Sequence, residues 1–220
     1  MTRLGLLLLP LLLAAPVQAG PWPQPDGQVF VSGTVEHAGG DDWVGTGYGE
    51  YGLTQNITLG FDSSVTAFVG EGYVFLRYPI LQSDGPNRFA VLGGVGASGN
   101  LERGVQPLWV IGASWGRGLQ YPFGNGWAAV DASIRFREEN SFASTRLTKL
   151  DATIGWQRDN RDLAILQIQT SEERGQDALI KFAPSYVWHF TDWFQLETGV
   201  TVPLAGDDVA KVKIGVWSQF

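Results

Sequence analysis

The chain contains no cysteine, one methionine and two histidines among its 220 residues. Without cysteine it has no disulfide framework, and it lacks the thiolate ligands that most structural zinc sites use. Basic residues are also scarce, since 15 Lys and Arg stand against 22 Asp and Glu, for a formal net charge of −7. Proteins bind phosphate backbones with clustered Lys and Arg, so this balance argues against a nucleic-acid partner.

A long hydrophobic run occurs once, at the amino end. Arg3 is followed by LGLLLLPLLLAA and then by small residues up to Ala19. A basic start, an apolar core and a small-residue end are typical of a secretory signal, which predicts cleavage between Ala19 and Gly20. The run is shorter than the roughly 20 apolar residues that a membrane-spanning helix needs. We therefore expect residues 1–19 to be a cleaved signal peptide and the rest of the chain to be exported.

Helical spacing of apolar residues is not sustained anywhere after the signal, whereas alternation with a period of two is nearly continuous. Residues 20–27 (GPWPQPDG) are rich in Pro and Gly and predict an extended periplasmic lead rather than a packed element. Beyond the lead we predict twelve strands, over 28–37, 43–54, 57–68, 72–82, 88–99, 106–119, 126–138, 146–157, 162–172, 178–190, 193–204 and 209–220.

The predicted fold class is all-β: a closed up-and-down antiparallel transmembrane β-barrel over residues 28–220. An even number of strands brings both termini to one side, where the last strand can pair with the first and leave no edge. Connections after every second strand read as tight turns, and the others are mostly longer and more acidic. We expect the tight turns and both termini to face the periplasm. Ten strands is the alternative, if the first strand or a weak early hairpin does not form.

Apolar faces on these strands predict contact with lipid. Leu150, Ile154 and Trp156 share one face of their strand, opposite Lys149 and Asp151. Such faces run for about ten residues without an interrupting charge, which is the length that a tilted strand needs to cross a bilayer. Aromatic residues near strand ends predict interfacial girdles; these residues are Trp43, Tyr73, Trp127, Trp156, Trp188, Phe190 and Trp193.

The last ten residues, KVKIGVWSQF, form an amphipathic strand that ends on Phe220. This segment resembles the carboxy-terminal signature of Gram-negative outer-membrane β-barrels. The resemblance implies the outer membrane as location, its lipid and lipopolysaccharide as surroundings, and reading of Phe220 by the barrel-assembly machinery. Ser218 departs from the signature, which usually has an apolar or aromatic residue two before the end. Residues 48–61 (YGEYGLTQNITLGF) are similar to a hairpin of small outer-membrane barrels that include proposed transporters linked to aromatic degradation.

Catalytic and cofactor motifs are weak. Local spacing places no serine beside His37 or His189, the two histidines that could act in a hydrolase. Residues 93–99 (GGVGASG) are glycine-rich, but no helix follows them to bind a phosphate. We therefore predict no enzyme activity, no cofactor and no metal.

Charged residues on the inner face are the best candidates for function. We predict that twelve of them face the lumen: Glu50, Asp62, Arg77, Asp131, Arg135, Arg137, Lys149, Asp151, Lys181, Glu197, Lys211 and Lys213. If the strands on either side of 139–146 pair, Arg135 falls opposite Asp151. One hypothesis is a narrow porin-like channel that passes small polar or charged solutes. A second is a non-conducting structural or interaction barrel with a salt-bridged lumen, and a lipid-modifying outer-membrane enzyme is less favoured.

Overall fold

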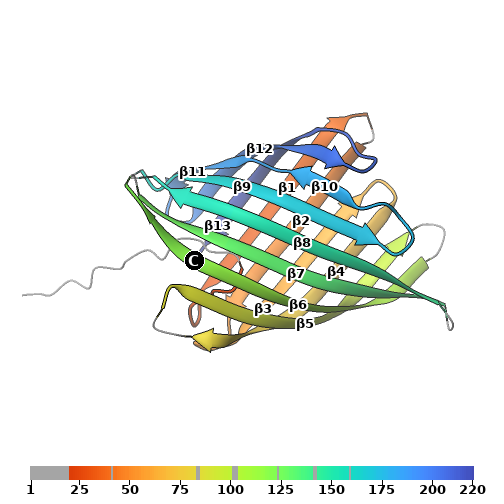
Figure 1. The fold of residues 1–220 in the computed structure, drawn as a ribbon, viewed down its shortest axis with the longest axis horizontal. Helices are drawn as coiled ribbons and strands as arrows, with labels where there is room; N and C mark the ends of the chain where they lie inside the picture. The colour runs from red at the N-terminus through yellow and green to blue at the C-terminus, as the bar shows by residue number, and fades with distance from the viewer. Residues whose placement is uncertain are drawn as a thin grey trace, which may run out of the picture.

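The computed structural model describes residues 20–40, 42–82, 85–100, 104–122, 124–140, 143–158 and 160–220, so the predicted signal peptide lies outside the described residues. All regular elements in the described part are strands (Figure 1). Their bounds are β1 Val29–Gly39, β2 Asp42–Gly52, β3 Thr58–Thr66, β4 Val69–Gln82, β5 Asn87–Asn100, β6 Gly104–Tyr121, β7 Gly124–Asn140, β8 Ala143–Gln157, β9 Leu163–Glu173, β10 Leu179–Phe182, β11 Ser185–Thr191, β12 Phe194–Ala205 and β13 Lys211–Gln219. No helix in these ranges is long and apolar enough to cross a membrane.

The sheet closes on itself through its first and last strands. β1 pairs antiparallel with β13 from Phe30 opposite Gln219 to His37 opposite Val212. Backbone hydrogen bonds continue to the final residue, because Val29 N donates to Phe220 O at 2.7 Å and Phe220 N donates to Val29 O at 3.0 Å. Closure pairs the backbone N–H and C=O groups that an edge strand would leave without partners. It also explains why the apolar and polar alternation continues to Phe220.

Thirteen strand segments form twelve barrel strands, because β10 and β11 are one strand with a break at Ala183–Pro184. Both segments pair with β9 on one side and β12 on the other. Proline has no N–H to donate to the sheet, but Pro184 O still accepts a hydrogen bond from Val200 N at 3.2 Å. The predicted twelve-strand closed antiparallel barrel is confirmed, and the continuous strand predicted over 178–190 has this break.

The barrel has two ends, which we name by what they carry. Among the described residues, the terminal end holds Val29, Phe220 and the connecting residues 53–57, 85–86, 122, 158, 160–162 and 192–193. The loop end holds Gly40 and the connections 67–68, 174–178 and 206–210, among the described residues. The prediction of mostly longer connections at the loop end is wrong, because the strands continue into the predicted loops.

In the hairpin of β7 and β8, the extension of the strands changes the register from the predicted one. Pairing extends to Asn140 and Ala143, so the turn is centred earlier in the chain than the sequence suggests. Asp131 therefore lies opposite Asp151, and Arg135 lies opposite Leu147. The predicted pairing of Arg135 with Asp151 is wrong.

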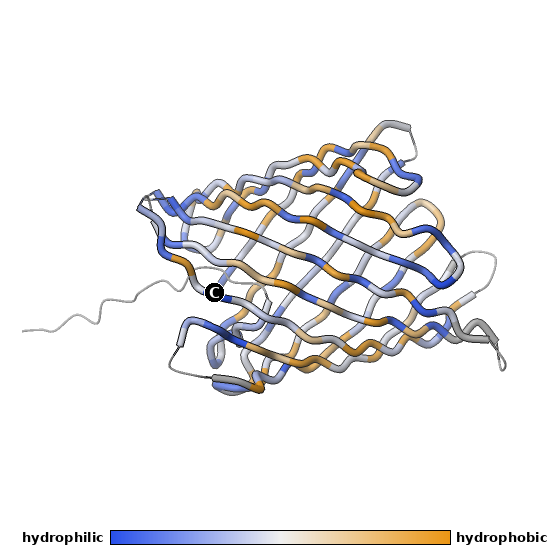
Figure 2. The backbone as a smooth tube through the Cα atoms, viewed as in Figure 1, coloured by the Kyte–Doolittle hydropathy of each residue, from blue (hydrophilic) through white to orange (hydrophobic). Residues whose placement is uncertain are grey.

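The outer surface of the barrel is apolar. Figure 2 shows hydrophobic positions recurring along the strands, while hydrophilic residues gather towards the two ends. Leu76, Ile111, Ile154 and Ile214 are exposed on this surface, as alternation predicts. Trp188, Phe190 and Trp193 are also exposed near the terminal end.

Part of the interior is apolar too, which corrects the predicted girdle. Tyr73 and Trp127 are only 8% and 5% exposed and belong to two clusters of buried residues. One cluster contains Tyr73, Phe75, Leu108 and Val110; the other contains Trp127, Ala129, Leu163, Ile165 and Val187. A twelve-strand barrel of this size is thus filled in places by side chains.

Residues 20–28, which we call the N-terminal segment, pack inside the terminal end. Pro21 is fully buried, and Trp22 packs against the cluster around Trp127. Gln24 N donates a hydrogen bond to Thr58 Oγ1 at 2.9 Å. The prediction of a lead that is not packed is wrong, because Pro21 and Trp22 meet an apolar patch on the inner wall.

Candidate functional site

The barrel encloses a cavity of about 430 Å³, which we call the lumen cavity. Eight of the twelve residues predicted to face the lumen line it: Asp62, Arg77, Asp131, Arg135, Lys149, Asp151, Glu197 and Lys213. The other four are Glu50, Arg137, Lys181 and Lys211, and each forms an ion pair. The cavity is lined largely by polar side chains, with aromatic rings such as Phe30 and Trp217 among them.

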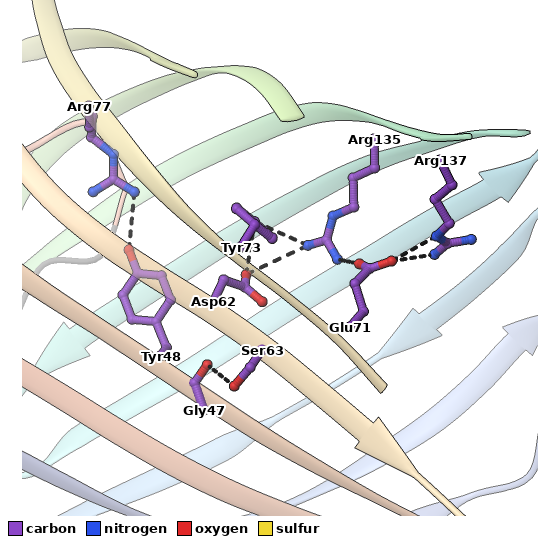
Figure 3. Close-up of polar contacts among 9 residues, drawn as sticks. All are labelled: Gly47, Tyr48, Asp62, Ser63, Glu71, Tyr73, Arg77, Arg135 and Arg137. Carbon is purple, nitrogen blue, oxygen red and sulfur yellow. Dashed lines mark hydrogen bonds and ion pairs between the residues drawn. The ribbon is translucent and has the colours of Figure 1, made fainter. Parts of the chain in front are cut away.

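The Tyr48 cluster joins β2 to β4 (Figure 3). Arg77 forms an ion pair with Glu50, and Tyr48 OH donates a hydrogen bond to the same carboxylate. Arg77 Nη2 donates to Tyr48 OH at 3.1 Å. Glu50 and Arg77 are both buried, so each charge needs the other to offset its loss of hydration.

The Arg135 cluster connects β3, β4 and β7 around Glu71 (Figure 3). Glu71 forms ion pairs with Arg135 and with Arg137, the latter at 2.7 Å from Nη2 to Oε2. Arg135 also donates to Tyr73 OH at 3.2 Å and lies 3.6 Å from Asp62 Oδ2. Tyr73 OH donates to Asp62 at 3.1 Å, which completes the network.

Glu71 is the member of this buried network that sequence reasoning missed. The glycines on either side of it suggested a loop, but β4 begins at Val69 and Glu71 is buried. A signal was present in the sequence, because Glu71, Tyr73, Phe75 and Arg77 alternate on one face.

Glu197 forms a third set of contacts beside the cavity. Lys213 Nζ lies 3.2 Å from Glu197 Oε1, and Trp217 Nε1 donates to Glu197 Oε2 at 3.0 Å. These contacts link β12 to β13 on their inner face.

Asp208 forms the fourth set, in the connection between β12 and β13. It lies 2.5 Å from Lys181 Nζ and 2.5 Å from Lys211 Nζ. Lys211 also reaches Asp42 at 3.3 Å. Partial burial raises the pKa of Asp208, but the hydrogen bonds from the two lysines outweigh it and lower that pKa to about 2.

Asp131 and Asp151 stand apart from these clusters. They face each other across β7 and β8 and both line the cavity. Ser114 Oγ donates to Asp131 Oδ1 at 2.6 Å, whereas Asp151 Oδ1 is buried without a hydrogen-bond partner among the described residues. No ion pair in the described part of the chain includes either aspartate. Arg77 acts on Asp131 from a longer distance, as Lys149 and Arg135 do on Asp151, which also accepts a hydrogen bond from the Thr170 backbone.

The two histidines lie at opposite ends of the barrel. His37 is near the end of β1 and is exposed. His189 Nε2 is 3.7 Å from Asp192 Oδ1 and 3.4 Å from Arg161 Nη1. No serine in the described ranges hydrogen-bonds to His189, and no group of three or more metal-ligating side chains converges there or elsewhere in those ranges.

Comparison with known proteins reveals the fold but no close relative. No family model and no curated protein matches the chain. A NanC porin structure gives a TM-score of 0.58 at 11% identity, covering 87% of this chain and 98% of that one. The KdgM porin in complex with disordered oligogalacturonate gives 0.57 at 8% identity, covering 88% and 99%. LpxR from Salmonella typhimurium gives 0.52 at 8% identity, covering 87% and 99%. The chain therefore shares the closed barrel fold of these proteins.

Proposed function

We propose that the protein is a narrow porin-like channel in the outer membrane of a Gram-negative bacterium, passing small polar or charged solutes without catalysis. The observation that carries this proposal is a cavity lined by eight charged side chains, inside a closed barrel whose outer surface is apolar. A water-filled lumen accepts charged side chains, whereas lipid accepts the exposed Leu and Ile residues. Two of the structures that share the fold are named as porins.

The charges around the cavity support a solute of low net charge. Four acidic side chains (Asp62, Asp131, Asp151 and Glu197) and four basic ones (Arg77, Arg135, Lys149 and Lys213) line it. An acidic oligosaccharide such as the one bound to the KdgM porin would be favoured by a positive lumen, and this lining is balanced. We therefore favour neutral or zwitterionic solutes.

We also propose an orientation for the barrel in the membrane. The terminal end would face the periplasm, and the loop end would face outward, towards lipopolysaccharide. Residues 1–19 would direct export and be removed. Phe220 is paired through its backbone, while its side chain is 69% exposed, which supports its proposed recognition by the barrel-assembly machinery.

Single-channel recording in planar bilayers tests the channel. We expect stepwise conductance whose ion selectivity shifts when the charge of a lumen residue is reversed in Lys149→Glu. The matched control is Leu150→Val, because Leu150 is the next residue and is exposed on the outer surface. A channel whose reversal potential responds equally to both changes would contradict passage through this cavity.

A second candidate function is a non-conducting structural barrel. The ion-pair clusters and the packed N-terminal segment favour it, because both fill space through which a solute would pass. Silence in bilayers from folded protein, with and without the N-terminal segment, would support this candidate over the channel.

A further inference from the structure

The N-terminal segment occupies a site inside the barrel that is shaped for it. A Cβ atom on Gly116 would lie 2.5 Å from the Trp22 ring and 2.6 Å from the Pro21 ring. A Cβ on Gly52 would lie 2.0 Å from Pro25 O. Such approaches are too close for any side chain larger than hydrogen, so glycine at 116 and 52 makes the room that the segment fills.

Hydrogen bonds hold the same segment to the first hairpin. Gly27 N donates to Gly52 O at 2.9 Å, and Gly52 N donates to Gln28 O at 3.0 Å. Gln24 N donates to Thr58 Oγ1 at 2.9 Å. Apolar packing and backbone pairing together fix the segment in one position rather than leaving it as a free tail.

This position brings Gly20 to Asp131. A Cβ built on Gly20 would lie 3.7 Å and 3.8 Å from the two carboxylate oxygens of Asp131, and Gly20 lines the lumen cavity. The Gly20 nitrogen is bonded to the same Cα, about 2.5 Å from that Cβ position. The amine of a chain that begins at Gly20 would be bonded to this Cα, beside the Asp131 side chain.

A cation at this point would offset the charges of Asp131 and Asp151. Like charges directly opposite each other on paired strands destabilise the sheet. The two carboxylates offset this with hydrogen bonds alone, from Ser114 to Asp131 and from the Thr170 backbone to Asp151. The described side chains put no cation within 4 Å of either residue. Cleavage of the predicted signal peptide would create a new α-amino group, whose positive charge could pair with these carboxylates.

We propose that removal of residues 1–19 creates a cation at this point: the α-ammonium of Gly20 binds Asp131, which lies opposite Asp151, and anchors the N-terminal segment as a plug in the terminal end of the lumen. A signal peptidase would hydrolyse the Ala19–Gly20 peptide bond. Water supplies the oxygen of the new Ala19 carboxylate, and the released Gly20 amine takes up a proton, as α-amines do near neutral pH. The plug rests on the proposed channel function, since it names the segment that would close the channel. The anchor rests on the proposed export, since export would include the cleavage after Ala19.

Amine labelling of the purified, folded barrel tests the anchor without reference to transport. Mass spectrometry should find Gly20 as the first residue, and a mature chain that begins elsewhere overturns the proposal.

Acetic anhydride at neutral pH should then acetylate the Gly20 amine at least about tenfold more slowly than in Asp131→Asn, a factor that corresponds to about 1.4 kcal/mol. Asp131→Glu, which keeps the charge, should retain the protection. Asp62→Asn should retain it too, because Asp62 is a cavity carboxylate held by Arg135 and Tyr73. Equal labelling rates in wild type and Asp131→Asn overturn the anchor.

Conductance tests the plug separately. Deletion of residues 20–27, with the signal joined directly to Gln28, should raise single-channel conductance, and Trp22→Ala should raise the frequency of openings. Unchanged conductance in a wild type that conducts overturns the plug. If neither wild type nor deletion conducts while the Gly20 amine stays protected, the anchor is supported and the proposed channel function fails.

Discussion

Glu71 holds two arginines inside the barrel, so its removal should expose how much the interior depends on paired charges. In Glu71→Gln, Arg135 and Arg137 lose their shared carboxylate in a buried setting. Breaking a buried ion pair by removing one partner lowers the free energy of unfolding by about 3–5 kcal/mol. Urea unfolding in detergent micelles, followed by tryptophan fluorescence, measures the change.

The matched control is Asp192→Asn, which removes an ion pair with Arg161 at the solvent-exposed terminal end. Exposed pairs contribute little, so this variant should unfold almost as wild type does. Equal losses in the two variants would show that the Arg135 cluster is as solvated as a surface pair.

Two neighbouring residues of β8 test which face of the strand meets lipid. Ile154 is 47% exposed on the outer surface, whereas Thr153 lines the lumen cavity. Ile154→Arg should lower the free energy of unfolding in lipid vesicles by about 2–4 kcal/mol if it lies near the bilayer midplane. Thr153→Arg should cost less, because its charge enters the water-filled lumen. If Thr153→Arg proves the costlier change, the proposed membrane contact is wrong.

At the scale of elements, Asp208 ties the connection between β12 and β13 to the ends of β10 and β13. Its pKa of about 2 lies below the ordinary value near 4. A depressed carboxyl pKa stabilises the fold above the unfolded-state pKa, and this stabilisation is lost as the pH falls towards the folded-state value. Wild type should therefore lose stability between about pH 4 and pH 2 more steeply than Asp208→Asn. Urea midpoints across this range measure the difference, and parallel curves would contradict the role assigned to Asp208.

The elements also show how far sequence reasoning reached. Alternation predicted the strands, their closure and the facing of residues such as Ile154 and Lys149, because side-chain period depends only on local geometry. The register of β7 on β8 was missed, because it depends on where the hairpin turns, and a displacement of the turn moved Asp151 from Arg135 to Asp131. The packing of Trp22 against Trp127 was missed because it joins residues far apart in the chain.

For the whole molecule, the proposed orientation can be tested because the chain has no cysteine of its own. Gln176→Cys places a single thiol in a connection of the loop end, and Gln55→Cys places one in a turn of the terminal end. Both positions are exposed. A membrane-impermeant maleimide should label Gln176→Cys on intact cells, and should label Gln55→Cys only after the outer membrane is opened. The reverse pattern would invert the proposed topology.

The pairing of Val29 with Phe220 has a consequence for how the barrel folds. It joins segments at opposite ends of the chain, as does the contact of Gln28 with Gln219, which are 191 residues apart. Closing a loop of that length costs about 5 kcal/mol of chain entropy, and contacts of such high separation form slowly. Until they form, β1 and β13 are open edges that can pair with another chain. A chain that lacks β13 should therefore remain an unclosed sheet that aggregates, even though the hairpins from β1 to β12 are intact.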